Sequence, residues 1–147
     1  MRIAIGCDHG GVDLKNAIID HLKNHNIQAK DFGTYTTDAA DYADYAQPVC
    51  EAVLAGGFDF GIIICGTGIG MSISANKIDG IRCALLSDVF SAKATRSHND
   101  SNVMALGARV IGPGLACEIV DAYLDTPFSN EARHVTRIGK IAKLEKR

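Results

Sequence analysis

The chain carries almost no excess of either charge and no long hydrophobic run. Its 147 residues include 15 lysines and arginines against 17 aspartates and glutamates, a formal net charge of −2. So small a charge argues against a general nucleic-acid-binding surface. No apolar stretch approaches membrane-spanning length, and the first one ends at Cys7, too early for a signal peptide. We therefore expect a cytoplasmic protein that binds neither nucleic acid nor membrane.

Paired cysteine motifs, internal repeats and low-complexity linkers are also missing. The absence of any C-x-x-C pair favours reduced thiols in a reducing compartment. The five cysteines are Cys7, Cys50, Cys65, Cys83 and Cys117. The histidines and acids show no metal-ligand spacing on a helix face, so no metal site is expected, and His21 and His25 are interpreted as ordinary surface histidines. Without a linker, residues 1–147 predict a single domain with a sizeable core.

Strands and helices are expected to alternate along the chain. Short apolar runs predict strands at residues 2–7, 62–64, 82–86 and 103–106, and a shorter, more polar segment at 28–32 predicts a strand at the edge of the sheet. Helical spacing of apolar residues predicts helices at residues 12–25, 42–54, 72–77, 88–97, about 115–123 and 130–145. This alternation is typical of an α/β fold, a parallel sheet with helices on both faces and right-handed crossovers.

A glycine-rich turn follows the buried strand at residues 62–64. It reads Cys65-Gly66-Thr67-Gly68-Ile69-Gly70 and leads into a helix. Glycines let the backbone approach a ligand closely, and the free N–H groups of a helix start attract anions and favour a thiolate. We expect a partly exposed thiolate at Cys65, suited to base or nucleophile chemistry. The alternative is a buried structural thiol, which we prefer for the other four cysteines.

Three better-known loops do not fit this turn. A dinucleotide-binding loop needs an acidic residue at the end of the next strand, where Ala84-Leu85-Leu86 stands. A Walker loop needs Gly-Lys-Ser/Thr, which does not follow. A phosphatase-type cysteine loop needs an arginine to hold the phosphate, and residues 65–72 contain none. The turn therefore indicates a different chemistry on an anionic or oxyanion-forming substrate.

Polar residues follow the ends of three predicted strands. They are Asp8-His9, the turn after Cys65, and Ser87-Asp88. Ligands of parallel sheets bind beyond the carboxyl ends of the strands, so a cysteine, two histidines and an aspartate could share one rim. The simpler alternatives are a helix cap with a solvent-facing imidazole at Asp8-His9, and a helix end followed by a turn at His98-Asn99-Asp100.

The last predicted helix carries Arg133, Arg137 and Lys140 on one face, because these residues are four and three positions apart. Its apolar residues point largely the other way. A solvated basic face is the ordinary explanation of such a pattern. The more specific alternative is that these basic residues bind a phosphate group.

Taken in order, these motifs closely resemble one family, type B ribose-5-phosphate isomerase, which is related to the subunits of galactose-6-phosphate isomerase. The resemblance spans almost the whole chain. The matching segments are Gly6-Cys7-Asp8-His9, Asp41-Tyr42, Cys65-Gly66-Thr67-Gly68-Ile69-Gly70, Ser74-Ala75-Asn76-Lys77, Gly80-Ile81-Arg82, Ser97-His98-Asn99-Asp100 and Asn102-Val103, together with Arg109, Arg133 and Arg137.

The resemblance implies a Rossmann-like, three-layer α/β/α fold around a five-stranded parallel sheet. It implies interconversion of ribose 5-phosphate and ribulose 5-phosphate through an enediolate, without metal or organic cofactor, as in the pentose phosphate pathway. It also implies a homodimer whose active sites draw residues from both subunits, paired in some members into a tetramer.

The resemblance also implies a role for each matching residue. Cys65 is the base that moves the carbon-bound proton, and Thr67 moves protons between the two substrate oxygens. His98 opens the sugar ring, assisted by Asp8. The residues that would bind substrate are His9, Tyr42, Gly66, Gly68, Gly70, Asn99, Arg109, Arg133 and Arg137. The glycines would offer N–H groups to the oxyanion, Tyr42 and Asn99 would form hydrogen bonds, and His9 with the three arginines would contact the phosphate.

One branch of this family has glycine at the position of Cys65 and a glutamate base at the position of Met71. This chain resembles the cysteine branch. Two other functions stay open. The substrate could be a hexose 6-phosphate, such as galactose or allose 6-phosphate, because pocket length cannot be inferred from sequence. The chain could also be a non-catalytic module that binds a phosphosugar or a nucleotide on the same rim.

Overall fold

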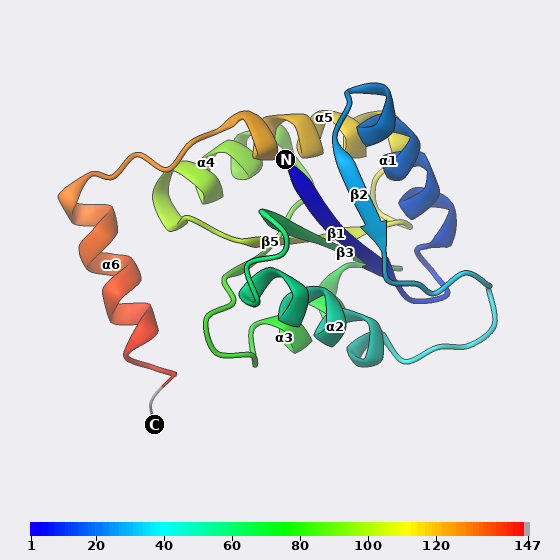
Figure 1. The fold of residues 1–147 in the computed structure, drawn as a ribbon, viewed down its shortest axis with the longest axis horizontal. Coiled ribbons are helices and arrows are strands. Elements are labelled where there is room, and N and C mark those ends of the chain that lie inside the picture. The colour runs from blue at the N-terminus through cyan, green and yellow to red at the C-terminus, as the bar shows by residue number, and fades with distance from the viewer. Residues whose placement is uncertain (146–147) are drawn as a thin grey trace.

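A computed structural model describes residues 1–145, in which five strands alternate with helices (Figure 1). The strands are β1 (Arg2–Cys7), β2 (Gln28–Asp31), β3 (Phe60–Cys65), β4 (Cys83–Leu85) and β5 (Val103–Gly107). The helices are α1 (Val12–Asn24), α2 (Tyr42–Leu54), α3 (Ile69–Ala75), α4 (Val89–Asn99), α5 (Pro113–Asp125) and α6 (Ala132–Ala142). The predicted bounds hold within about three residues, and α3 begins earlier than predicted because the glycine turn passes directly into it.

All five strands form one parallel sheet in the order β2-β1-β3-β5-β4, which confirms the predicted α/β class. The chain leaves β1 toward β2 on one side and continues to β3 on the other. This reversal separates the loops after β1 and β3, and such a switch point is where parallel α/β sheets bind ligands. The carboxyl ends of β1 and β3 are therefore the expected place for a site.

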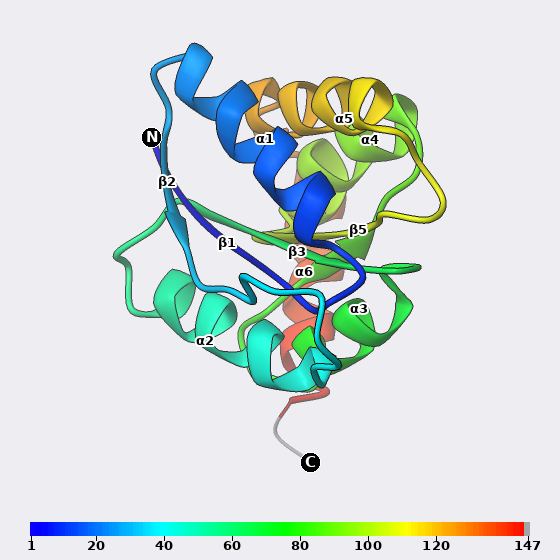
Figure 2. The ribbon, with the colours of Figure 1, turned by 90° about the vertical axis from the view of Figure 1, so that its right-hand side faces the viewer.

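Helices cover both faces of the sheet, with α1, α4 and α5 on one side and α2 and α3 on the other (Figure 2). Each face of the sheet packs against its helices to form a hydrophobic core. Successive residues of a strand point into these two cores in turn, because side chains alternate between the faces of a sheet. Ile62 and Ile64 of β3 pack toward α1 and α5, whereas Ile63 and Cys65 pack toward α2 and α3. The three central strands are buried on both faces, which explains their continuous apolar runs.

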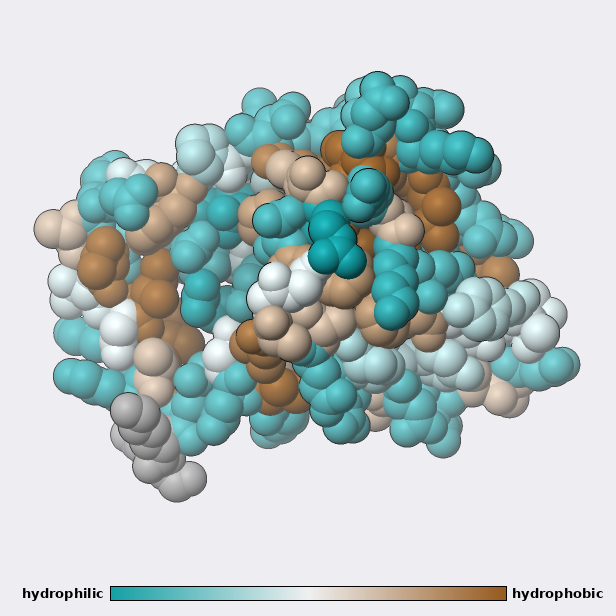
Figure 3. Space-filling model, viewed as in Figure 1, coloured by the Kyte–Doolittle hydropathy of each residue, from teal (hydrophilic) through white to brown (hydrophobic). Residues whose placement is uncertain are grey.

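The last helix, α6, stands away from the body of the molecule (Figure 1). Its apolar side chains Val135 and Ile141, and Leu144 beyond its end, remain 51%, 40% and 58% exposed. Hydrophobic side chains gather on the side of α6 that faces the body (Figure 3). A cleft of about 690 Å³ lies between Ile141 and Leu144 on one side and the segment after α3, at residues 76–83, together with α4 on the other. Within residues 1–145, no helix combines the length and the apolar character that a membrane span needs.

Candidate functional site

A hollow of about 230 Å³ lies at the carboxyl ends of β1, β3 and β5. The residues that line it are Asp8, His9, Gly10, Tyr42, Cys65, Gly66, Thr67, Gly70 and Arg109. It is smaller than the cleft beside α6, but it holds the thiol, carboxylate, imidazole and guanidinium groups together. Eight of the predicted site residues meet here, and we call this hollow the Cys65 pocket.

Cys65 lines this pocket, and its thiol receives a hydrogen bond from the backbone. The N–H of Gly68 donates to Sγ, with 3.0 Å between nitrogen and sulfur. A donor at this distance stabilises negative charge on sulfur. The predicted partial exposure of Cys65 is wrong, because only 4% of the residue is exposed. Its side chain points toward α2 and α3, and the turn that follows folds back over the sulfur.

The turn depends on the backbone conformation of one glycine and on the missing side chain of another. Gly68 is the N-cap of α3 and has φ of +77°, a left-handed conformation that glycine reaches without strain. At Gly70, a Cβ would lie 2.9 Å from the ring of Tyr42, so the missing side chain makes room for that ring at the pocket wall. The hydroxyl of Thr67 accepts from the N–H of Ile69 at 3.3 Å and stays on the exposed side of the turn.

Asp8 and His9 follow β1 and are both held in place by backbone groups. The carboxylate of Asp8 accepts from the N–H of Gly10 at 2.8 Å, and the residue is 6% exposed. The Nδ1 atom of His9 lies 3.2 Å from the nitrogen and 3.3 Å from the oxygen of Ala40, which anchors the ring through one nitrogen. The contact with Ala40 was not predicted, since nothing in the polar loop at residues 33–41 marks it.

Arg109 follows β5, and it brings a guanidinium group to the Cys65 pocket. Its backbone N–H donates to the carbonyl of Gly66 at 2.9 Å. Its side chain lies so close to Gly66 that a Cβ there would be 3.4 Å from the guanidinium carbon. The third predicted polar cluster, Ser87-Asp88, does not line the pocket, because β4 is the edge strand beyond β5. Asp88 instead caps α4 by accepting from Ser91 N–H at 2.7 Å.

His98 and Asn99 do not share the rim with Cys65, which corrects the expectation of a single rim. They end α4, and a crossover helix runs antiparallel to its strands, so its last turn lies at the amino edge of the sheet. The Nε of Arg82, just before β4, donates to the carbonyl of Asn99 at 3.0 Å. Arg96 stacks 4.6 Å from the ring centre of Phe60, the first residue of β3. Cys65 is five residues further along that strand, about 16 Å away.

Arg133 and Arg137 lie on α6, also away from the Cys65 pocket. Both are exposed, and Arg133 Nε donates to the carboxylate of its neighbour Glu131 at 2.8 Å. Within this chain the thirteen predicted site residues therefore fall into two groups. One surrounds Cys65, and the other comprises His98, Asn99, Arg133 and Arg137.

The second group contains a histidine that the sequence did not single out. The ring of His134 packs against that of His98, with centroids 4.6 Å apart. Its Nδ1 lies 2.7 Å from the hydroxyl oxygen of Ser129, and the residue is 3% exposed. Burial, followed by the charge of Arg133, lowers the pKa of His134, so it favours the neutral form. In the sequence, only the position of His134 between Arg133 and Arg137 pointed to a place in the site.

The remaining cysteines behave as structural thiols. All five are free. Cys7 and Cys50 are buried, as predicted, and burial raises the pKa of Cys7 to about 11 and of Cys50 to about 12. Cys83 and Cys117 are only half-buried, so the expectation of full burial is wrong for them, although burial raises the pKa of both.

His21 and His25, interpreted from the sequence as ordinary surface histidines without ligand spacing, lie beside an acidic residue in the fold. They are four residues apart at the end of α1, which is a ligand spacing on a helix face, and both lie near Asp121 of α5. The sequence alone does not reveal this cluster, because Asp121 is 100 residues from His21 in the chain.

Comparison with known proteins agrees with the motifs. Residues 3–141 match the Ribose/Galactose Isomerase family. Ribose-5-phosphate isomerase B of Escherichia coli (strain K12) is 46% identical over 146 residues, 99% of this chain and 97% of that protein. D-erythrulose-4-phosphate isomerase of Pectobacterium atrosepticum is 44% identical over 149 residues, 99% and 98% of the two chains. The structure of Clostridium thermocellum ribose-5-phosphate isomerase B aligns with a TM-score of 0.97 at 49% identity, covering 99% and 98%. The chain therefore belongs to the ribose/galactose isomerase family, as its ordered motifs predicted.

Proposed function

We propose that this protein interconverts ribose 5-phosphate and ribulose 5-phosphate. The observation that carries the proposal is the Cys65 thiol, which accepts the Gly68 N–H within a pocket that also holds Asp8, Thr67 and Arg109. Aldose–ketose isomerisation needs a base at carbon, hydrogen-bond donors for the enediolate oxygen, and an anchor for the phosphate. The matching relatives named for this reaction support the choice of substrate.

The proton transfer is assigned to Cys65 and Thr67. The Cys65 thiolate removes the proton from C2 of the open-chain aldose, and the electron pair moves to the carbonyl to give an enediolate. The same proton returns from sulfur to C1. Thr67 moves a proton between O1 and O2, which its exposed hydroxyl allows. Backbone N–H groups of the glycine turn stabilise the oxygen that gains charge. Neither a metal nor an organic cofactor takes part.

We further propose that a second copy of the chain completes each site. His98 lies at the edge of the sheet opposite Cys65, so one subunit cannot bring the ring-opening histidine to its own base. Helix α6 stands away from the body with apolar side chains exposed, as expected for a surface that a partner covers (Figure 3). In the dimer, His98 and Asn99 of one subunit reach the Cys65 pocket of the other, where Tyr42 and Asp8 also meet the substrate.

The phosphate contacts divide between the two subunits in the same way. Arg109 and His9 line the Cys65 pocket, whereas Arg133 and Arg137 come from α6 of the second subunit. Bidentate guanidinium groups suit a phosphate dianion. Binding this remote group positions the reacting carbons at Cys65. Two such dimers could pair into a tetramer.

A second candidate is isomerisation of a different sugar phosphate. The family is named for ribose and galactose, and one relative is named for a four-carbon phosphosugar, D-erythrulose 4-phosphate. The same pocket chemistry serves any aldose–ketose pair, because only the distance from phosphate to carbonyl changes. Galactose and allose 6-phosphates belong in the same assay for this reason.

The first experiment measures isomerisation of ribose 5-phosphate by the purified chain, with Cys65→Ala alongside and with chelator added. We expect wild-type turnover that chelator does not change, and a loss of at least a thousandfold in the variant. Binding of ribose 5-phosphate by both proteins without turnover would instead favour a non-catalytic module. An inactive wild type that turns over a tetrose or hexose phosphate would favour the second candidate.

The shared site is tested by mixing two inactive variants. In a Cys65→Ala/His98→Asn heterodimer, one site carries both changes and the other carries neither. Random exchange of subunits makes half of the dimers mixed, so about a quarter of wild-type turnover should return. Cys65→Ala mixed with Thr67→Ala is the matched control, because both changes fall on the same side of the site and no turnover should return. No recovery in the first mixture would contradict the shared site.

A further inference from the structure

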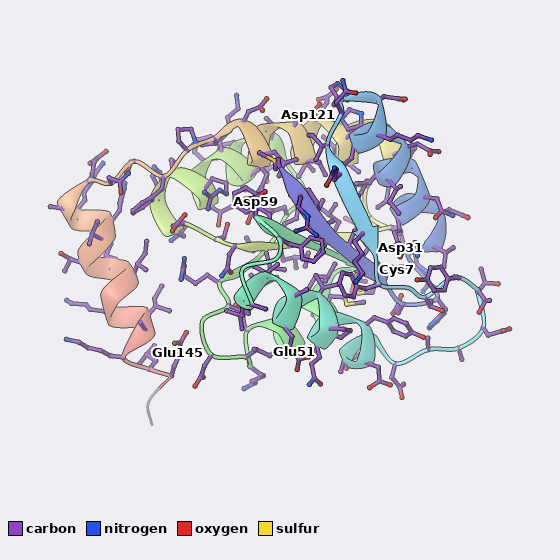
Figure 4. All side chains as sticks on the ribbon, in the orientation of Figure 1. Cys7, Asp31, Glu51, Asp59, Asp121 and Glu145 are labelled. Carbon is purple, nitrogen blue, oxygen red and sulfur yellow. The ribbon has the colours of Figure 1, made fainter. Side chains whose placement is uncertain are left out.

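Two histidines and an aspartate meet on the surface, away from the Cys65 pocket. His21 and His25 lie one helical turn apart at the end of α1, and Asp121 comes from α5. Each residue offers one ligand atom, and these atoms all lie within 4.8 Å of one another. Figure 4 places Asp121 on α5 beside α1. The Nε2 atom of His21 is 2.7 Å from Asp121 Oδ1, across 100 residues of sequence.

Hydrogen bonds already orient both imidazoles. The Nδ1 atom of His25 lies 2.8 Å from the backbone oxygen of His21. A carbonyl oxygen can only accept, so Nδ1 carries the proton and Nε2 keeps its lone pair for a ligand. This arrangement, in which one ring nitrogen donates to a carbonyl and the other binds a metal, is the usual one for metal-binding histidines. The pair of His21 and Asp121 holds a proton that a metal ion would replace.

The spacing of the three atoms suits a small divalent ion. Zn²⁺ binds nitrogen and carboxylate oxygen at about 2.0–2.2 Å, so two of its ligands lie about 3.3 Å apart in a tetrahedral site. The present distances, 2.7 Å for one pair and up to 4.8 Å for the widest, lie on either side of this value. The side chains of His21 and Asp121 are 19% and 44% exposed, and His25 is exposed, so small rotations can close the site.

We propose that His21, His25 and Asp121 form a site for a divalent first-row transition metal, with Zn²⁺ as the probe. Two imidazoles and one carboxylate favour such an ion over Mg²⁺ or Ca²⁺, which prefer oxygen ligands alone. The fourth position is left to water. The ion would link the end of α1 to α5 and stabilise the folded chain, because these helices are separated in the unfolded chain. The site is independent of the proposed isomerase reaction.

The test is a calorimetric titration of metal-free protein with Zn²⁺ in a Cys65→Ala background, which removes the pocket thiol as a competing ligand. We expect one ion per chain. His25→Ala and Asp121→Asn should each weaken the affinity at least tenfold. Asp20→Asn is the matched control, since Asp20 is an exposed carboxylate on the same helix, and it should leave the affinity unchanged. The side chains of His25, Asp121 and Asp20 are at least partly exposed, so these substitutions should not disturb folding.

A thermal melt gives a second measurement. At a hundredfold excess of Zn²⁺ over the dissociation constant, the Tm of the protein should rise by roughly 5–10 °C. The same excess should leave the Tm of His25→Ala unchanged. Zinc binding that neither His25→Ala nor Asp121→Asn weakens would overturn the proposal and place the ion at the remaining thiols.

Discussion

The backbone N–H of Gly68 points at the sulfur of Cys65, with 3.0 Å between the two atoms. The same glycine has φ of +77° and faces the backbone of β5, where a Cβ would lie 2.9 Å from the carbonyl carbon of Leu106. One residue therefore holds the thiol and closes the turn against the sheet. The proposed base and the packing of the glycine turn depend on the same backbone conformation.

Gly68→Ala should damage stability and activity together. An alanine at this φ is strained, and its methyl group meets the Leu106 backbone, so the free energy of unfolding should fall by about 1–3 kcal/mol. The altered turn should also lower kcat at least tenfold. Urea denaturation and the isomerase assay measure the two effects. Gly114→Ala is the control, because a Cβ there has no neighbour within 4 Å and the residue lies in helix α5; it should leave kcat unchanged and should not lower the free energy of unfolding. Unchanged stability of Gly68→Ala would refute the argument.

His134→Ala should impair ring opening rather than substrate binding. Without the ring that packs 4.6 Å from His98, that imidazole loses its orientation, so kcat for the cyclic sugar phosphate should fall about tenfold while KM stays within about twofold. Turnover of an open-chain substrate should be spared. Arg137→Ala is the contrasting variant and should mainly raise KM, because phosphate binding is shared by ground and transition states. A rise in KM alone for His134→Ala would make it a phosphate contact instead.

Lys15→Met should destabilise the fold strongly. Lys15 is fully buried on α1, and its Nζ donates to Asp31 at 2.8 Å and to the carbonyl of Thr34 at 2.7 Å. Removing the ammonium leaves a partly buried carboxylate without its partner, which should cost about 2–4 kcal/mol in the free energy of unfolding. Lys15→Met/Asp31→Asn should recover part of this loss. The exposed Lys23→Met on the same helix should change stability by less than about 0.5 kcal/mol.

The buried thiols predict a loss of stability at high pH. Their pKa values are about 11 for Cys7 and about 12 for Cys50 in the folded chain, against 9.0 ordinarily. Above about pH 9 the unfolded chain releases these protons first, so the free energy of unfolding falls as pH rises toward 11–12. Cys50→Ala should flatten this slope by up to about 1.4 kcal/mol per pH unit. Parallel pH profiles for the wild type and the variant would contradict the assignment.

The local elements were predictable because their causes are local. Short apolar runs located four of the five strands, the polar segment at 28–32 located the edge strand β2, and a glycine-rich segment after Cys65 marked the turn at the end of β3. Residues joined by long-range contacts were not predictable in this way. Lys15 looks like any charged residue on a helix, and only the fold brings it to Asp31 and Thr34. The three-residue cluster around Asp121 was missed for the same reason.

The sequence by itself determined the order of the strands and helices, the parallel class of the sheet and the chemistry available at the Cys65 turn, since each depends on neighbours in the chain. Tertiary structure alone decided which polar groups share an edge. The strand order brings Arg109 after β5 beside Gly66, and it leaves Ser87-Asp88 beyond the pocket. The antiparallel course of α4 carries His98 to the opposite edge. The physical reason is that the direction of a crossover, and not the spacing of a motif, sets the edge at which a side chain emerges.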